Sequence, residues 1–310
     1  MKTVPLGPAG PSVPNVVLGM MRIADKSDDQ IRELVGTARD AGIAFFDHAA
    51  VYGPPLHHCE QRFADALRLS SSDRAEVTIQ TKAGIVPGAG YDSSYEHLVG
   101  SVDESLRALR TDYLDVLLIH RPDALVEPDE VARAFDDLEA AGKVRAFGVS
   151  NHTAGQIELL RTAVTQPLVA NQLQLSLTHA SIVTQGLAAN MVGEDQSLTL
   201  DGGGLLDYCR KHQLTVQAWS PLQAGVAAGT FLGSPAFPTL NAAIDRLAAR
   251  YGVPPIAVAT AWITRHPAQM QVVLGTTTPA RITGAALGSD LRLTRPEWYE
   301  LLLAAGHRAP

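Results

Sequence analysis

The sequence predicts a (β/α)8 or TIM barrel, a closed ring of eight parallel strands with helices around it. Three observations carry this prediction. Short apolar segments recur eight times, the spacing between them leaves room for helices, and polar residues or glycine follow each segment. Strands that are apolar on both faces are typical of parallel sheets covered by helices, and strand–helix alternation specifies such a sheet. The fold typically takes about 250 residues, so we expect residues 1–310 to form one domain.

A short hairpin is predicted to precede the barrel. Segments 3–7 and 11–14 flank Pro8, Ala9 and Gly10, a turn sequence, and we expect this β-hairpin to close the barrel bottom. The eight barrel strands then follow in chain order. They are predicted at 16–18, 43–46, 77–80, 114–119, 144–149, 168–170, 214–218 and 271–274.

Helix signals lie between the predicted strands. Ser27 can cap a first helix, which carries its apolar side chains on one face and stops at Gly42. Pro128 in the first turn of a later helix and Gly142 just past its end follow the usual asymmetry of helix termini. A final signal follows the last strand and places Arg281 in the second turn of a helix. The remaining helices are predicted at 56–69, 94–109, 128–141 and 153–164.

Two segments, 176–204 and 223–238, are longer than ordinary connections. Long ordered loops on the active face of a barrel usually act as lids or substrate walls. For the first segment, which ends in Gly202, Gly203 and Gly204, partial disorder is a close second interpretation.

Composition narrows the class of protein. The net charge of −7 argues against nucleic acid or an acidic membrane as partner, because both demand a basic surface. Cys59 and Cys209 are the two cysteines, too few for a disulfide framework. Four prolines rather than an apolar run mark the N-terminus, and no segment approaches the roughly 20 apolar residues of a membrane span. We expect a cytoplasmic enzyme for a small molecule, a monomer or weak homo-oligomer.

Four residues form a candidate proton-transfer set: Asp47, Tyr52, Lys82 and His120. They follow the second, third and fourth predicted strands, whose carboxyl ends meet in the mouth of a barrel. A tyrosine titrates near pKa ~10, and a neighbouring ammonium favours its phenolate and lowers that value. Asp47 would keep Lys82 charged, and His120 would donate to the reacting oxygen. Such a set suits protonation of an alkoxide as it forms from a carbonyl.

Each of these residues also has a structural interpretation. A buried Lys–Asp pair is usually structural, a tyrosine after a strand usually packs, and a histidine at a strand end is often a core residue. The order of the four and their places at strand ends favour the functional interpretation.

Taken with further motifs, the four residues resemble the aldo-keto reductases over essentially the whole chain. The motifs are 47–53, Lys82, 120–122, 148–151, 171–172, 219–222 and 275–282. The resemblance implies a barrel that reduces aldehydes or ketones with a nicotinamide cofactor and without a metal. It further implies that Tyr52 is the general acid, that Lys82 and Asp47 tune it, and that His120 orients the carbonyl.

A second set of residues is predicted to hold the cofactor. Ser150, Asn151 and Gln172 offer the donors and acceptors that a carboxamide requires, and Trp219 offers a ring for stacking. Backbone amides along the segment from Ser220, Pro221 and Leu222 to Gly225 can cradle a pyrophosphate. Segment 150–153 also fits a helix cap, and 220–221 an ordinary turn.

The last motif favours NADPH. The hydroxyls of Thr276 and Thr277, the helix amides that follow Gly275, and the Arg281 guanidinium make a good phosphate site. The resemblance assigns this site to the 2′-phosphate. Two departures from the family leave NADH use open: Gly275 stands where many relatives have lysine, and 284–285 is Gly-Ala in place of Glu-Asn.

Two other classes of protein remain as alternatives. One is a cofactor-binding regulatory subunit that senses redox state, with little turnover. The other is a metallohydrolase that places a divalent ion among Asp47, Lys82 and His120. The cluster of His57, His58 and Cys59 does not favour a metal site, because adjacent residues on one helical turn point in different directions. The leading hypothesis is reduction of a carbonyl by NADPH, with the proton from Tyr52.

Overall fold

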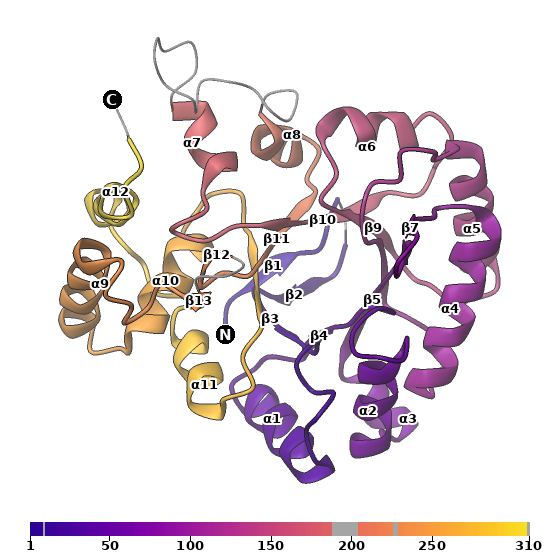
Figure 1. The fold of residues 1–310 in the computed structure, drawn as a ribbon, viewed down its shortest axis with the longest axis horizontal. Coiled ribbons are helices and arrows are strands. Elements are labelled where there is room, and N and C mark those ends of the chain that lie inside the picture. Colours follow the sequence, from indigo (N-terminus) through magenta and orange to yellow (C-terminus); the bar gives the residue numbers. More distant parts are fainter. Residues whose placement is uncertain (9, 188–203, 226–228, 309–310) are drawn as a thin grey trace.

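The computed structural model describes residues 1–8, 10–187, 204–225 and 229–308. Eight parallel strands close into a barrel in the order β10-β11-β14-β3-β4-β5-β8-β9, as the sequence predicts (Figure 1). The strands are β3 (Val16–Gly19), β4 (Phe45–Asp47), β5 (Thr78–Ala83), β8 (Val116–Ile119), β9 (Phe147–Ser150), β10 (Leu168–Gln174), β11 (Thr215–Trp219) and β14 (Gln271–Leu274).

Helices surround the barrel (Figure 1). They are α1 (Asp28–Asp40), α2 (His58–Leu67), α3 (Ser71–Ala75), α4 (Tyr95–Leu109), α5 (Pro128–Ala140), α6 (Ala154–Leu160), α7 (Ser181–Leu187), α8 (Leu205–Lys211), α9 (Pro238–Tyr251), α10 (Pro255–Thr264), α11 (Pro279–Leu287) and α12 (Arg295–Ala304). Among the described residues, no helix is both long and apolar enough to cross a membrane.

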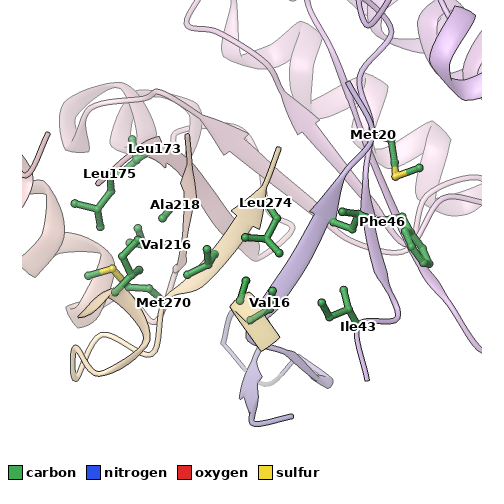
Figure 2. Close-up of a cluster of buried hydrophobic side chains, with 14 of the residues drawn as sticks. Val16, Met20, Ile43, Phe46, Leu173, Leu175, Val216, Ala218, Met270 and Leu274 are labelled. Atoms are coloured by element: carbon green, nitrogen blue, oxygen red, sulfur yellow. The ribbon is translucent and has the colours of Figure 1, made fainter. Parts of the chain in front are cut away.

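The main hydrophobic core lies between the strands and the helices. Helix α1 buries Ile31, Leu34 and Val35 in this core, where they join strand residues such as Val16. Figure 2 shows part of the core along β3, β11 and β14. Because side chains alternate across a strand, the neighbour Val17 points the other way, into the barrel.

The signals at the helix ends behave as the sequence predicts. Ser27 caps α1 in a capping box with Gln30. Helix α5 has proline in its first turn, and Gly142 follows it with φ of +69°. Thr153 caps α6, so segment 150–153 does serve as a helix cap.

Strands β3, β4, β9 and β11 end one residue later than predicted, and β5 and β10 extend further still. Strand β5 continues to Ala83 and β10 to Gln174, so Lys82 and Gln172 lie inside strands rather than after them. A polar residue ends an apolar sequence pattern, but it does not end backbone pairing. Lys82 pairs with Leu118 of β8, and Gln172 pairs with Gln217 of β11. Helix α6 is shorter than predicted and ends at Leu160.

The N-terminal hairpin closes the barrel bottom, which confirms the prediction. Strands β1 (Thr3–Pro5) and β2 (Ser12–Pro14) pair in antiparallel fashion. The hairpin buries Val4, Leu6 and Val13 against inward-facing side chains at the amino ends of the barrel strands. Gly7 needs to be glycine, because its φ is +71° and a Cβ would lie 2.5 Å from the Cα of Val169.

Two further hairpins appear that the sequence pattern did not predict. They are β6 (Ile85–Val86) with β7 (Gly90–Tyr91), and β12 (Gln223–Gly225) with β13 (Gly229–Thr230). The second hairpin begins the predicted long segment 223–238. The other predicted long segment, 176–204, contains α7, and its residues 188–203 lie outside the described residues.

Candidate active site

A cavity of about 590 Å³ opens where the barrel strands end. Its lining includes nearly all the residues that the sequence singles out for chemistry or cofactor binding. These are Asp47, Tyr52, His120, Ser150, Asn151, Gln172, Trp219, Ser220, Pro221, Leu222, Gly275, Thr276, Thr277 and Arg281. Residues of the β12–β13 hairpin add a wall, as predicted for segment 223–238.

The strand register brings the proton-transfer set together. Asp47 is the last residue of β4, and His120 follows β8 directly, donating its N–H to the Ala83 carbonyl at 2.8 Å. Tyr52 lies on the loop after β4. That loop is attached to β5, because the Ala50 N–H donates to the Lys82 carbonyl at 3.0 Å.

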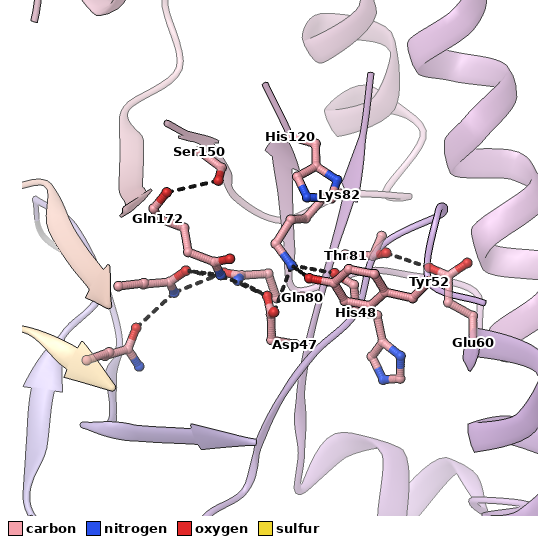
Figure 3. A network of polar contacts seen from close by, with 12 residues as sticks. Asp47, His48, Tyr52, Glu60, Gln80, Thr81, Lys82, His120, Ser150 and Gln172 are labelled. Atoms are coloured by element: carbon pink, nitrogen blue, oxygen red, sulfur yellow. Dashed lines mark hydrogen bonds and ion pairs between the residues drawn. The ribbon is translucent and has the colours of Figure 1, made fainter. Parts of the chain in front are cut away.

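Lys82 is the centre of the set (Figure 3). Its ammonium donates to Asp47 Oδ2 at 2.7 Å, to the His48 carbonyl at 2.7 Å and to the Tyr52 hydroxyl at 3.0 Å. These three bonds use all its hydrogens. The Tyr52 oxygen accepts from Lys82, so the phenolic hydrogen stays available for another acceptor.

The charges in the set are fixed by opposing effects. Burial raises the pKa of Tyr52 above its ordinary value of 10.0; the predicted lowering by Lys82 is present but smaller. Tyr52 is therefore protonated at neutral pH. Burial alone lowers the pKa of Lys82, but Asp47 and Tyr52 raise it above the ordinary value, which keeps the ammonium charged.

His120 lies beside Tyr52, with the two rings edge to face and their centroids 6.1 Å apart. Burial, with further contributions from Lys82 and Arg121, lowers the pKa of His120 to about 2. The imidazole is therefore neutral and carries one N–H, so it can donate one hydrogen bond without becoming a cation.

His48 belongs to the core rather than to the cavity. Its ring packs edge-on against Phe63, with centroids 4.8 Å apart. Burial, with a smaller contribution from Lys82, lowers its pKa to about 3. Neither ring nitrogen has a hydrogen-bond partner among the described residues. Its contribution to the site is the main-chain carbonyl that accepts from Lys82.

The residues predicted to hold a carboxamide bond to one another. Ser150 Oγ donates to the Gln172 carbonyl at 2.9 Å and accepts from Asn151 Nδ2 at 2.7 Å. Trp219 Nε1 donates to Asn151 Oδ1 at 3.1 Å. The donor and acceptor types of these side chains fit a carboxamide. A carboxamide that binds here must replace some of the hydrogen bonds that the side chains make to one another.

The predicted pyrophosphate cradle is only partly open. The Gln223 N–H donates to the Ser220 carbonyl at 3.1 Å, which makes an ordinary turn of this segment. Gly225 lies in β12, where it pairs with Gly229. Ser220, Pro221 and Leu222 line the cavity next to this turn.

The phosphate motif begins directly after β14, at Gly275, and extends into the first turn of α11. Arg281 is the third residue of α11 and so belongs to its first turn, not to the second turn that the sequence predicted. Thr278 precedes the helix and makes no side-chain capping bond within the described part of the chain. The Thr276 and Thr277 hydroxyls and the exposed Arg281 guanidinium are donors that fit a phosphate. The first-turn amides contribute less, because Pro279 has no N–H and that of Arg281 donates to the Thr278 carbonyl at 2.9 Å.

The structure explains one departure from the family pattern. Gly284 lies where α11 packs on α10, and a Cβ there would come within 2.7 Å of Ile256 Cγ2. A glutamate does not fit at this position. Helix α11 therefore packs closely against α10 at the place where the family resemblance implies a contact with adenine.

The histidine–cysteine cluster has internal partners. His57 Nδ1 lies 2.6 Å from Glu60 Oε2, and His58 Nε2 lies 3.2 Å from the Ala24 carbonyl. Within residues 1–8, 10–187, 204–225 and 229–308, no group of three or more His, Cys, Asp or Glu side chains is arranged to hold a metal ion.

Sequence reasoning gave no role to two parts of the site. Arg22 and Arg121 line the cavity, and Arg121 holds its guanidinium 5.8 Å from the Trp219 ring centroid. Below the cavity, Gln80, Gln217 and Gln271 face the barrel interior and bond to one another or to Asp47. The available signal was polar residues inside strands that are otherwise apolar.

A barrel with a protonated tyrosine, a charged lysine and a neutral histidine at its mouth defines an enzyme of the carbonyl-reducing class. The chain belongs to the Aldo/keto reductase family, whose model matches residues 15–301. It is 35% identical over 302 residues to a 6-dehydroglucose reductase of Agrobacterium fabrum, covering 94% of this chain and 93% of the relative. It is 32% identical to the oxidoreductase YdhF of Escherichia coli over the full length of both chains.

A solved structure has the same fold. The crystal structure of a putative 2,5-diketo-D-gluconic acid reductase B superposes with a TM-score of 0.73 at 25% identity, covering 98% of this chain and 92% of that one. The family membership supports an oxidoreductase that acts on small carbonyl compounds.

Proposed function

We propose that this protein reduces an aldehyde or ketone to the alcohol with NADPH, and that Tyr52 supplies the proton. One observation carries the proposal. The buried Tyr52 hydroxyl accepts a hydrogen bond from Lys82 and so keeps its own hydrogen for an acceptor in the cavity. A phenol in this arrangement is a proton donor whose conjugate base lies against an ammonium.

The four residues then act on a carbonyl in sequence. Its oxygen accepts from Tyr52 and from the neutral His120, which polarises the carbonyl. A nicotinamide held by Ser150, Asn151, Gln172 and Trp219 would supply the hydride for the carbonyl carbon. As the alkoxide forms, Tyr52 transfers its proton to that oxygen. Lys82 stabilises the phenolate left behind, and Asp47, at 2.7 Å, balances the charge of Lys82.

The proposal of NADPH over NADH rests on the first turn of α11. Arg281, Thr276 and Thr277 together offer a guanidinium and two hydroxyls at the positively polarised end of a helix. A 2′-phosphate satisfies these donors, whereas a 2′-hydroxyl leaves most of them to water. Ser150, Asn151, Gln172 and Trp219 would hold the nicotinamide end.

Replacement of Tyr52 tests the reaction and its proton donor. Tyr52→Phe keeps the ring and removes the hydroxyl, so we expect turnover to fall by a factor of at least about 10². NADPH oxidation followed by absorbance, with a reactive aromatic aldehyde and a sugar aldehyde as substrates, measures this. Cofactor binding, followed by quenching of tryptophan fluorescence, should stay within about twofold of the wild type.

Three results would contradict the proposal. Undiminished turnover in Tyr52→Phe would remove Tyr52 from the role of proton donor. A wild-type protein that binds NADPH tightly but reduces none of the carbonyls would instead favour the regulatory, redox-sensing alternative. A loss of activity on chelation, with metal bound to the purified protein, would favour the hydrolase.

A further inference from the structure

Four glutamines form a polar layer inside the barrel at the floor of the cavity, which Gln172 lines. Gln80, Gln172, Gln217 and Gln271 are all buried, with at most 3% of any residue exposed. They lie at matching heights, because Gln217 pairs in register with both Gln172 and Gln271, and Gln80 pairs with Asp47. Below this layer is the apolar layer closed by the N-terminal hairpin. An interior filled by apolar side chains is usual for this fold, so the amides call for a specific explanation.

The layer is one connected network (Figure 3). Gln80 Nε2 donates to Asp47 Oδ1 at 2.6 Å and to Gln217 Oε1 at 2.9 Å, while Gln172 Nε2 reaches the same two oxygens at 3.0 Å and 3.1 Å. Gln217 Nε2 donates to Gln80 Oε1 at 3.0 Å and to Gln271 Oε1 at 2.9 Å. Gln271 Nε2 donates to the Pro14 carbonyl at 2.7 Å.

The direction of every amide in this network is fixed at its two ends. An ionised Asp47 can only accept, so Gln80 and Gln172 must turn their NH2 groups toward it. The Pro14 carbonyl can only accept, so Gln271 turns its NH2 group downward and its oxygen toward Gln217. Gln217 then has a single satisfying orientation between them.

The network determines how Asp47 is held. Oxygen Oδ1 receives two amide donors, which leaves Oδ2 for Lys82 at 2.7 Å. Gln80 lies in β5 two residues before Lys82, so a single strand supplies a donor to each oxygen of the Asp47 carboxylate. Gln80 donates to Oδ1 and Lys82 donates to Oδ2. Gln80 is not a lining residue of the cavity, which separates it from direct contact with a substrate.

We propose that Gln80 is a positioning residue of the proton-transfer set: it holds Asp47 in the orientation that places Lys82 on Tyr52, and Gln217, across the barrel, fixes the orientation of the Gln80 amide. The role rests on the proposed function of Tyr52 and Lys82. Gln80 acts through Asp47 and touches neither substrate nor cofactor.

Gln80→Glu tests the proposal with almost no change of shape. A protonated glutamic acid can donate to Asp47 as the amide does, whereas an ionised one repels it. The two carboxyl groups share a site, so the pKa of the new group is raised. We expect kcat near the wild-type value at low pH, and a fall of tenfold or more as pH rises through that pKa, on the order expected for a misplaced acid–base group. Gln80→Met, which cannot donate, should have low kcat throughout.

Gln166→Glu is the matched control. Gln166 is also buried, and its Nε2 donates to Asp136 Oδ1 at 2.7 Å and to Glu139 Oε2 at 3.2 Å. These two carboxylates lie in α5 and, unlike Asp47, do not contact Lys82 or Tyr52. Both glutamate variants should lose thermal stability with rising pH, while only Gln80→Glu should acquire the new pH dependence of kcat. NADPH affinity should be unchanged in both. A kcat–pH profile for Gln80→Glu that runs parallel to that of Gln166→Glu would overturn the proposal.

A measurement without turnover separates this inference from the proposed function. The melting temperature of Gln80→Glu should fall with rising pH, because the raised pKa gives stability that is lost as the group ionises. Adding Asp47→Asn should shift this fall to lower pH, since the like charge is gone. A double variant with the same profile as Gln80→Glu would show that Gln80 does not act on Asp47, even if the wild type reduces no carbonyl.

Discussion

Arg281 is the one guanidinium that the described start of α11 directs to the predicted phosphate end of the cavity. A charge-assisted bond from arginine to phosphate contributes about 1.5–3 kcal/mol. We therefore expect Arg281→Ala to weaken NADPH binding by roughly 10- to 150-fold. NADH binding should change by less than about twofold, because NADH has no 2′-phosphate.

Fluorescence titration of both cofactors against both proteins measures this difference. Equal losses for NADPH and NADH would mean that Arg281 contacts a part of the molecule that the two share. In that case the preference for NADPH would have to come from other residues.

At the scale of single residues, the sequence predicted the site residues that follow apolar strands, but it did not predict contacts between residues that are far apart in the chain. Asp47, Tyr52 and His120 stand out because polar residues follow apolar strands, and all three line the cavity. Gln80 and Gln217 are 137 positions apart and meet only across the closed barrel. Their pairing depends on strand order and register, which no local pattern contains. The net pKa direction of Tyr52 likewise depends on how deeply the finished fold buries it.

At the scale of elements, α10 and α11 illustrate how packing limits substitution. Gly284→Ala places a Cβ 2.7 Å from Ile256 and 3.2 Å from Pro254, so one helix must shift. Such overpacking typically costs about 1–3 kcal/mol. Gly36→Ala is the control, since Gly36 lies in α1 with open space around it, and there we expect a gain of about 0.5–1 kcal/mol.

Urea unfolding of the two variants distinguishes these effects. The midpoint should fall for Gly284→Ala and rise for Gly36→Ala, relative to the wild type. If Gly284→Ala were as stable as the wild type, the tight contact between the helices would not limit this position. The adenine-contacting glutamate of relatives would then be absent for another reason.

The ends of helices were predictable where a capping residue marks them in the sequence. Ser27, Gly142 and Thr153 mark helix ends through caps that act locally, and the structure has them there. Strands β5 and β10 were predicted too short, because polar residues such as Lys82 and Gln172 interrupt the apolar pattern while the backbone pairing continues past them. The β12–β13 hairpin was not predicted; its strands are short and carry little apolar alternation.

At the scale of the whole molecule, the two ends of the barrel differ in role. The bottom contributes to the stability of the fold, and the mouth carries the residues proposed for chemistry. The fold class follows from the eight-fold repetition along the sequence, and the hairpin at the bottom follows from the turn sequence between segments 3–7 and 11–14. The glutamine layer lies between the two ends and connects the hairpin, through Pro14, to Asp47. The apolar layer below it contains none of the four proton-transfer residues, so damage there should affect stability far more than catalysis.

Leu6→Ala tests this division. Leu6 is 2% exposed and packs inside the barrel bottom with residues from the hairpin and the strands. Truncation of a buried leucine costs about 2–5 kcal/mol, partly through the cavity left behind. We expect the urea midpoint to fall accordingly while kcat at a temperature where the protein is folded stays within about twofold of the wild type. If kcat fell tenfold with the midpoint unchanged, the bottom and the mouth would be coupled, and the glutamine layer would be the path of contact between them.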